Sequence, residues 1–390
     1  MVAVEELSLA ELRRRTSAKW RTYPADVLPL PVAEMDFPIA APVAETLHAA
    51  VGRSDLGYAS PNSGLAEALA GFAARRWGWK VDPARVTLAP EVGVAVVEVL
   101  RLLVRPGDRV VVNPPVYDSF FPWIAEVGGR LVEVPLARTS DGWALHLDAM
   151  QAAFQAGARV HLLCSPHNPT GTVHRRHDLE RLAALAARYG VTVLADEIHA
   201  PLVLPGRTHH PFVSVSPEAA RHGMVFTSAS KAWNLAGLKC AAIVTADAAT
   251  RRLLQRLPEE LPWRVGQLGV LGGIAAFRAG EPWLEEVLAV LDHHRHYLAE
   301  LLAAKIPAIG YRPPDASYLA WLDCRALGLG DDPSAVFLAR GRVALSPGPS
   351  FGRPGAGHAR LNMATSRRIL AAAVDRMATA IDGTTADWSA

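Results

Sequence analysis

The chain has few of the residues that would mark several common classes of protein. Only three cysteines occur among 390 residues, at positions 164, 240 and 324. Their spacing suits neither a disulfide framework nor a zinc site, so we expect them to be small core residues. No apolar run approaches the ~20 residues of a membrane-spanning helix. The charged N-terminus lacks a signal-peptide pattern, and we therefore expect a cytoplasmic protein.

Excess charge, a dinucleotide fingerprint and metal-ligand spacing are also lacking. The 40 basic and 38 acidic residues give a net charge of +2, which does not suggest a nucleic-acid partner. No G-x-G-x-x-G run follows a predicted strand, which disfavours a nicotinamide enzyme. His293, His294 and His296 lie on an expected helix without a carboxylate at ligand spacing. We expect a solvated helix face there and no metal site.

Lysine is scarce, which narrows the choice of an amine nucleophile. The chain has five lysines, and Lys231 ends the run Thr-Ser-Ala-Ser-Lys. Ser228 precedes it by three positions, and Lys239 follows it by eight. A lysine can hold an aldehyde as an imine when its surroundings lower its pKa. A serine and a second cation nearby would suit an aldehyde that also carries a phosphate.

Three predicted strands end in polar residues. The apolar runs 160–163, 191–195 and 224–227 read as buried parallel strands, and a helix over 178–189 closed by Gly190 separates the first two. They lead to Asn168, Asp196 and Lys231. Ligands of doubly wound α/β sheets gather at the carboxyl ends of the strands. An acid at such a tip is costly unless it meets a cation, which a pyridinium nitrogen would supply.

These motifs resemble the fold-type I pyridoxal-phosphate enzymes of the class I/II aminotransferase superfamily. More narrowly, the chain is similar to the MalY/PatB group of cystathionine β-lyases, also called C–S lyases. The resemblance covers nearly the whole chain and rests on residues 16–20, 28–37, 57–58, 105–108, 114–117, 166–169, 196–199, 230–238 and 351–362. It implies an α/β fold with a mostly parallel seven-stranded central sheet in a large lobe, and a smaller α+β lobe.

The resemblance implies pyridoxal 5'-phosphate as cofactor, held as an imine by Lys231. Asp196 would pair with the pyridine nitrogen and keep it protonated. Asn168 would donate to the ring hydroxyl oxygen. Tyr117 would stack on the face of the ring.

The cofactor phosphate would meet the Ser228 hydroxyl, the Lys239 amine and two backbone amides, those of Val92 and Gly93, where an apolar helix begins. Glu91 stands just before them, where relatives usually have glycine. Tyr58 would reach the phosphate from a neighbouring subunit, which implies a homodimer.

The substrate would be a small amino acid whose α-carboxylate is clamped by Arg360 through two parallel hydrogen bonds. Ala33 belongs to the loop expected beside the substrate. On this loop Pro31 replaces the usual Trp and Glu34 the usual Asp, and elsewhere Lys239 replaces a common Gln. Because Pro31 and Glu34 lie on the loop expected near the substrate, they suggest a changed side-chain preference.

The function implied is a β-lyase that cleaves L-cystathionine or related cysteine S-conjugates to thiol, pyruvate and ammonia. An aminotransferase, or a specialised biosynthetic enzyme, would use the same residues. A cofactor-binding regulator is disfavoured, because Lys231 is present and no spare segment could form a DNA-binding domain. We expect residues 1–45 and 285–390 to form the small domain and 46–284 the large cofactor-binding domain.

Overall fold

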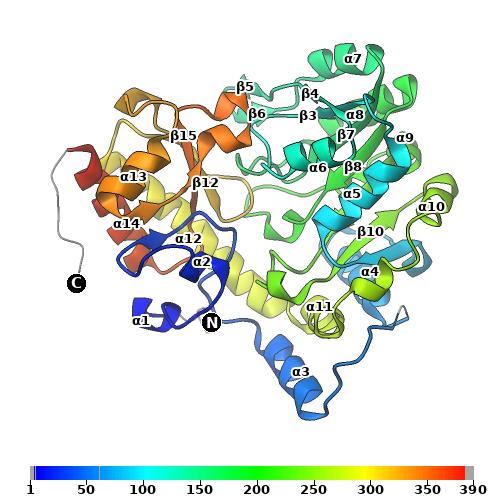
Figure 1. Cartoon of the computed structure of the whole chain (residues 1–390), viewed down its shortest axis with the longest axis horizontal. Coiled ribbons are helices and arrows are strands. Elements are labelled where there is room, and N and C mark those ends of the chain that lie inside the picture. The colour runs from blue at the N-terminus through cyan, green and yellow to red at the C-terminus, as the bar shows by residue number, and fades with distance from the viewer. Residues whose placement is uncertain (1–3, 5, 61, 383–390) are drawn as a thin grey trace.

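A seven-stranded sheet lies at the centre of the computed structural model, which describes residue 4 and residues 6–60 and 62–382. In spatial order its strands are β2 (Val86–Ala89), β10 (Ala241–Thr245), β9 (Gly223–Thr227), β8 (Thr192–Asp196), β7 (Ala158–Cys164), β3 (Arg109–Val112) and β4 (Arg130–Glu133). Strand β10 is antiparallel to both neighbours, and the other pairs are parallel. The predicted mostly parallel α/β sheet is confirmed (Figure 1).

Helices cover both faces of this sheet, which explains why its inner strands β8, β9 and β10 are mostly apolar and almost fully buried. Successive strand residues point to opposite faces. Leu194 therefore packs with α5 (Val92–Leu103), whereas Val193 packs with α8 (Arg176–Tyr189). The remaining helices of these layers are α6 (Phe120–Glu126), α7 (Leu147–Gln155), α9 (Pro217–His222) and α10 (Ala248–Leu254). The helix expected over 178–189 begins two residues earlier as α8, and Gly190 caps it with φ of 66°.

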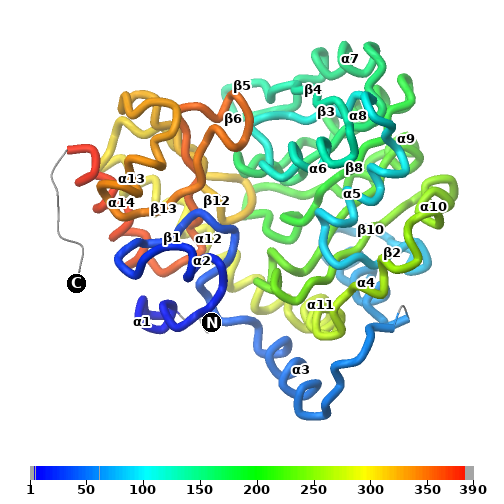
Figure 2. The backbone as a smooth tube through the Cα atoms, in the orientation of Figure 1, coloured from blue at the N-terminus to red at the C-terminus, as the bar shows by residue number. Residues whose placement is uncertain are grey.

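A second sheet of four antiparallel strands lies beside the first (Figure 2). Its order is β11 (Gly310–Tyr311), β12 (Leu319–Asp323), β15 (His358–Asn362) and β14 (Ser346–Pro347). The long helix α12 (Glu281–Lys305) and the helices α13 (Pro333–Gly341) and α14 (Arg367–Ile381) pack around it. Strand β1 (Leu28–Pro29) pairs with β13 (Val343–Ala344), so the N-terminal segment joins this C-terminal region.

The remaining elements complete the layers without changing this arrangement. They are α1 (Leu9–Leu12), α2 (Ala18–Arg21), α3 (Ala41–Gly52), α4 (Leu65–Trp77), α11 (Gln267–Ala279) and the hairpin β5 (Ala137–Thr139) with β6 (Gly142–Ala144). The expected domain borders after residues 45 and 284 fall inside α3 and α12, and the division into domains stays a prediction. Among the described residues, no helix combines the length and the apolar character needed to span a bilayer.

The expectation of a solvated histidine face on α12 was wrong for one residue. His293 and His296 are exposed, but His294 is buried, and its Nδ1 lies 3.0 Å from the carbonyl oxygen of Met363. The backbone carbonyl compensates for the polar ring in the core. Because this acceptor is 69 positions away in sequence, helical spacing could not reveal it.

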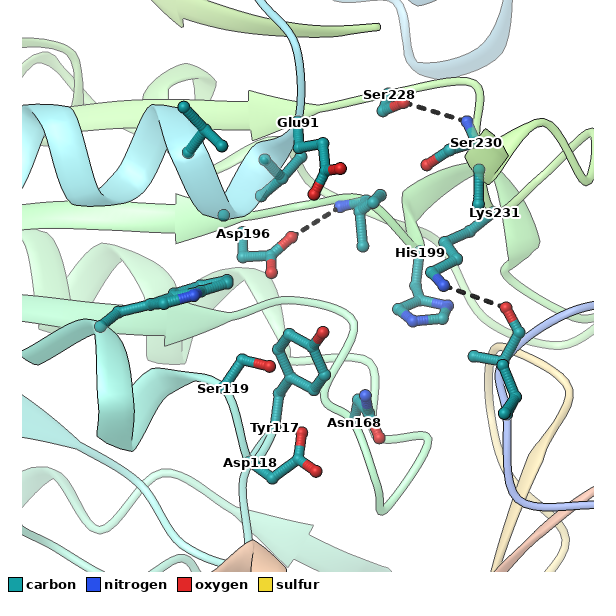
Figure 3. A pocket seen from close by; sticks show the side chains of 18 of the residues that line it. Glu91, Tyr117, Asp118, Ser119, Asn168, Asp196, His199, Ser228, Ser230 and Lys231 are labelled. Carbon is teal, nitrogen blue, oxygen red and sulfur yellow. Dashed lines mark hydrogen bonds between the residues drawn. The ribbon is translucent and has the colours of Figure 1, made fainter. Parts of the chain in front are cut away.

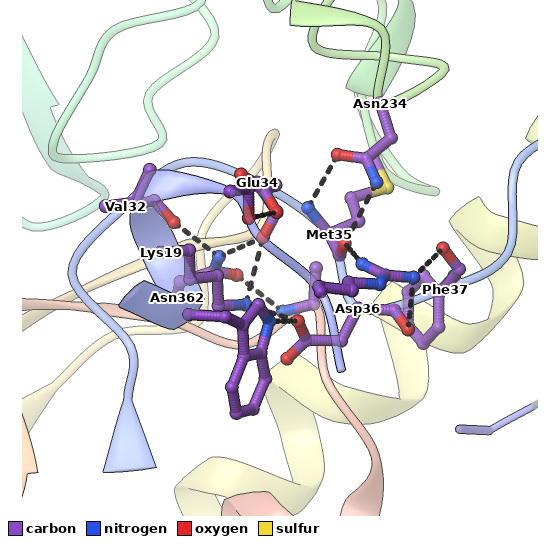
Figure 4. A network of polar contacts seen from close by, with 12 residues as sticks. Lys19, Val32, Glu34, Met35, Asp36, Phe37, Asn234 and Asn362 are labelled. Atoms are coloured by element: carbon purple, nitrogen blue, oxygen red, sulfur yellow. Dashed lines mark hydrogen bonds and ion pairs between the residues drawn. The ribbon is translucent and has the colours of Figure 1, made fainter. Parts of the chain in front are cut away.

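A buried ion pair anchors the loop that follows β1 (Figure 4). Lys19 Nζ lies 2.9 Å from Asp36 Oδ1, and both side chains are almost fully buried. The same carboxylate oxygen accepts a hydrogen bond from Trp20 Nε1 at 2.9 Å, and Lys19 also donates to the Glu34 carbonyl at 3.1 Å. A buried charge is tolerated when it is paired and hydrogen-bonded in this way.

Removing one member of this pair should destabilise the protein strongly. In Lys19→Ala, Asp36 keeps a buried carboxylate without its partner, and we expect the free energy of unfolding to fall by about 3–5 kcal/mol. Lys19→Met combined with Asp36→Leu should recover most of that loss in urea unfolding. The matched control is Lys305→Ala, which breaks an exposed pair with Asp375 and should cost less than about 1 kcal/mol. Equal losses in the two single variants would contradict the structural role of the buried pair.

Candidate active site

The polar residues predicted at the three strand ends line one cavity of about 760 Å³. Asn168 follows β7, Asp196 ends β8, and Lys231 follows β9. These strands are adjacent and parallel, so their carboxyl ends meet at one edge of the sheet. Figure 3 shows the three side chains around the cavity, on the side of the sheet edge where α5 begins. The three side chains that the sequence placed at strand ends therefore lie around one cavity.

Lys231 is half-buried, and its ammonium group has one direct partner. Its Nζ donates to the carbonyl oxygen of Ala33 at 3.0 Å, and the Tyr318 hydroxyl donates to the same oxygen at 3.1 Å. Burial, together with the positive charge of Arg360, lowers the pKa of Lys231 to about 8. A minority of this amine is therefore neutral near neutral pH, but a much larger fraction than in an ordinary lysine, and a nucleophile or proton acceptor requires this neutral form.

Asp196 is buried and lacks a full counter-charge. Its Oδ1 accepts a hydrogen bond from the Ile198 amide at 3.1 Å, but burial outweighs this contact and raises the pKa of Asp196 to about 7. A cationic ring nitrogen beside the carboxylate would favour its ionised form again. The environment of Asp196 thus suits a ligand that carries positive charge at this depth.

Arg360 enters the cavity from the second sheet, on β15. Its Nη1 donates to Asn168 Oδ1 at 3.0 Å, and its Nη2 donates to Ser346 Oγ at 3.0 Å and to the Pro31 carbonyl at 2.8 Å. Its Nε is among the few buried polar atoms of the described residues that have no hydrogen-bond partner. Burial lowers the pKa of Arg360 from its ordinary value, but guanidinium remains charged. The group retains donor capacity for a carboxylate.

An anion-binding corner lies at the N-terminus of α5. The amides of Val92 and Gly93 open this helix, and the first amides of a helix have no partner within it. Ser228 Oγ donates to the Cys240 carbonyl at 2.6 Å and accepts from the Ser230 amide at 3.0 Å. Its hydroxyl would have to turn to contact a phosphate.

Two residues at this corner have neighbours that the sequence alone did not reveal. Lys239 forms an ion pair with Glu91 and is not an isolated cation. Gly93 packs against Trp123, and a Cβ atom at position 93 would lie 2.6 Å from the indole ring. Trp123 lines the cavity and was not among the expected site residues, although it follows Tyr117 in the same Pro-Pro-initiated segment.

Tyr117 lines the cavity, and its ring packs edge-on against Trp123 with centroids 5.7 Å apart. Burial raises the pKa of Tyr117, so its phenol stays neutral. His199 also lines the cavity. Its Nδ1 lies 3.1 Å from Ser317 Oγ, and burial lowers the pKa of His199 to about 3. The imidazole is therefore neutral at physiological pH.

Tyr58 lies apart from the cavity lining of its own chain. Its side chain is 85% exposed, and its ring lies edge-on to that of Trp263, with the ring centroids 6.4 Å apart. Cys164 and Cys240, expected only as core residues, line the cavity as free thiols. Burial raises the pKa of both thiols, so neither is a reactive thiolate.

Taken together, these polar groups fit a ligand with an aldehyde, an anionic group and a ring cation. Lys231 can form an imine, the start of α5 can receive the anion, and Asp196 can meet the cation. A metal is not suggested: the described part of the chain contains no group of three or more histidine, cysteine or acidic side chains that could hold one.

Comparison with known proteins gives concordant matches over almost the full length. A protein of Mycobacterium tuberculosis, provisionally named a cystathionine beta-lyase, is 45% identical over 96% of this chain and 97% of its own. The cystathionine beta-lyase PatB of Bacillus subtilis is 33% identical over 91% of this chain and 93% of its own. A crystal structure from Corynebacterium diphtheriae, provisionally described as a PLP-dependent beta-cystathionase, has a TM-score of 0.92 at 36% identity and covers 97% of this chain and 99% of that one.

A family model extends the same result to the level of the superfamily. Residues 25–377 match the family described as aminotransferase class I and II. This range includes both sheets and the cavity residues described above, from Pro31 to Arg360. The chain therefore belongs to the class I and II aminotransferase family, among the relatives of PatB and MalY.

Proposed function

We propose that this protein is a pyridoxal-phosphate-dependent C–S β-lyase that cleaves L-cystathionine or a related cysteine S-conjugate. The observation that carries the proposal is the meeting of Lys231, Asp196 and Arg360 in one cavity. Relatives that align over most of the chain and are named cystathionine beta-lyases support the reaction class. The overall change is hydrolytic: cystathionine and water give homocysteine, pyruvate and ammonia.

Pyridoxal phosphate, when bound, withdraws electrons from the α-carbon of the amino-acid substrate. Asp196 would hold the ring nitrogen in its protonated form. Asn168 would donate from its amide nitrogen to the ring hydroxyl oxygen, which is compatible with Arg360 donating to its Oδ1. Tyr117 would pack on the ring face, and Ser228 with the amides of Val92 and Gly93 would receive the phosphate.

Lys231 would then take the proton from the substrate α-carbon. A lysine whose pKa is near 8 can take up and release a proton near neutral pH, because this pKa is well below that of an ordinary lysine. The Ala33 carbonyl, which accepts from Lys231 Nζ, limits the directions in which the amine can move. Arg360 would fix the α-carboxylate, so that the Cβ–S bond is held in one orientation while the thiolate leaves.

The active unit we propose is a homodimer. Tyr58 is exposed and outside the cavity of its own chain, which suits a residue that contacts the cofactor phosphate of a partner subunit. Its hydroxyl would supply an additional donor at the anion-binding corner. A cytoplasmic location stays a prediction.

The reaction can be tested by product analysis with L-cystathionine and no added keto acid. We expect pyruvate, ammonia and thiol to accumulate together over many turnovers, because each β-elimination regenerates the starting enzyme. A single turnover that resumes only when a keto acid is added would instead identify an aminotransferase. Both outcomes can be measured on the same holoenzyme preparation.

Replacing the proposed imine-forming lysine should remove both the cofactor absorbance and the reaction. Lys231→Ala has no amine to join the cofactor aldehyde, so the visible band of the holoenzyme should vanish and turnover should fall by at least about 10³-fold. Lys80→Ala changes an exposed lysine and should retain both. A Lys231→Ala variant that keeps the band and the activity would refute the assignment.

Asp196 should make the stability of the cofactor-free protein depend on pH. Its pKa is raised to about 7, so the folded chain binds the proton more tightly than the unfolded chain. The resulting stability is full below about pH 4 and is lost as pH rises through 7. Asp196→Asn cannot ionise, so its melting temperature relative to that of the wild type should rise between about pH 4 and 7.

With the cofactor bound, the wild type should instead have the higher melting temperature, because the ring nitrogen gives the Asp196 carboxylate a cationic partner. The control is Asp148→Asn at an exposed position, where the difference from wild type should not change with pH. If Asp196→Asn melts in parallel with wild type at every pH, with and without cofactor, Asp196 is not the ring-nitrogen partner.

A further inference from the structure

Glu91 and Lys239 contact each other at the phosphate corner. They lie 148 positions apart in sequence, and the Lys239 ammonium forms an ion pair with the Glu91 carboxylate. A pair of opposite charges thus joins two residues that line the cavity.

The pair connects the two elements that frame the corner. Glu91 is the N-cap of α5 and immediately precedes the amides of Val92 and Gly93. Lys239 ends the turn before β10, with a left-handed φ of 57°. Both residues line the cavity, and Figure 3 shows the Glu91 carboxylate pointing into it. The ion pair therefore lies at the cavity wall and not on a remote surface.

The charge of Glu91 acts on the cavity interior as well as on its partner. It raises the pKa of Lys231, although burial and Arg360 outweigh that effect. An anion beside the first turn of a helix is favourable, but it competes with any second anion for the same amides and dipole. Within this corner Lys239 is the cation, and one of its donors is engaged by Glu91.

We propose that Glu91 and Lys239 act as one charge pair that tunes how tightly the corner holds the cofactor phosphate. Glu91 orients Lys239 and offsets part of its charge, which weakens phosphate binding relative to a free lysine. Lys239 in turn shields the phosphate from Glu91. The inference rests on the proposed cofactor but not on the choice between lyase and aminotransferase.

The test is a set of cofactor-binding measurements on Glu91→Gln, Lys239→Gln and the double variant. Each protein is stripped of cofactor and titrated with pyridoxal phosphate, following the visible band and the quenching of tryptophan fluorescence. Trp123 lines the cavity and can report binding without turnover. Inorganic phosphate, titrated as a competitor, reports the corner alone. The matched control is Glu285→Gln, which removes the acidic member of an exposed ion pair between Glu285 on α12 and Arg76 on α4.

Glu91→Gln should tighten binding by about three- to tenfold, because Lys239 is freed and a nearby anion is removed. Lys239→Gln should weaken it by about tenfold, since Glu91 then faces the phosphate without a partner. The double variant should return to within about threefold of wild type, and inorganic phosphate should follow the same order. Glu285→Gln should have no effect.

Two results would overturn the inference, and they can be told apart. If every protein acquires the visible band, but Glu91→Gln binds no tighter than wild type and the double variant matches Lys239→Gln, Glu91 has no part in phosphate binding. If wild type acquires no band at all, the proposed cofactor fails and the inference fails with it. Melting temperatures of the stripped variants identify any loss caused by misfolding, and Glu91→Gly then provides a second neutral replacement.

Discussion

The buried attraction between Lys19 and Asp36 is the interaction on which the geometry of the active-site loop depends. Residues 30–37 have no regular secondary structure, so their backbone groups need partners from elsewhere. Side chains supply them: Asn362 donates to the carbonyls of Val32 and Glu34, and Asn234 bonds both the amide and the carbonyl of Met35. The ion pair fixes one end of this loop in the core. The Ala33 carbonyl is thereby held where Lys231 can reach it.

The cavity combines two buried charged groups, Asp196 and Arg360, with the half-buried Lys231, and their charges are not balanced locally. The two cations, Lys231 and Arg360, have lowered pKa values, and the acid Asp196 has a raised one, in each case because burial removes hydration. For Asp196 and Arg360, such shifts run against the charged forms that these groups would use with a ligand. A cationic ring beside the acid and an anionic carboxylate beside the arginine would reverse them. The site is thus electrostatically complementary to an amino acid joined to a pyridine ring, and that complementarity comes from two different sheets.

The part of the site that the sequence predicted follows from the geometry of parallel sheets. The strand ends at Asn168, Asp196 and Lys231 were predictable, because apolar strands in a β–α–β order must bring their carboxyl ends to one edge. Pairings between distant residues were not predictable in this way. The Glu91–Lys239 pair and the acceptor of buried His294 join positions 148 and 69 apart. Cavity lining by Trp123 depends on the packing of α6 against α5, which no local pattern encodes.

Pro31 and Glu34 were both expected to affect substrate preference, but the two residues have different surroundings. Pro31 lines the cavity, and its carbonyl accepts from Arg360, a contact that any residue's backbone would provide. Its ring therefore contributes to the shape of the wall without altering the contact with Arg360. Glu34 is not part of the cavity lining among the described residues, and its carboxylate accepts from the Ser17 hydroxyl at 2.6 Å. Its charge reaches Lys231 only through space, where it favours the protonated amine and raises the pKa. We therefore expect position 31 to affect the shape of the cavity and position 34 to affect the basicity of Lys231.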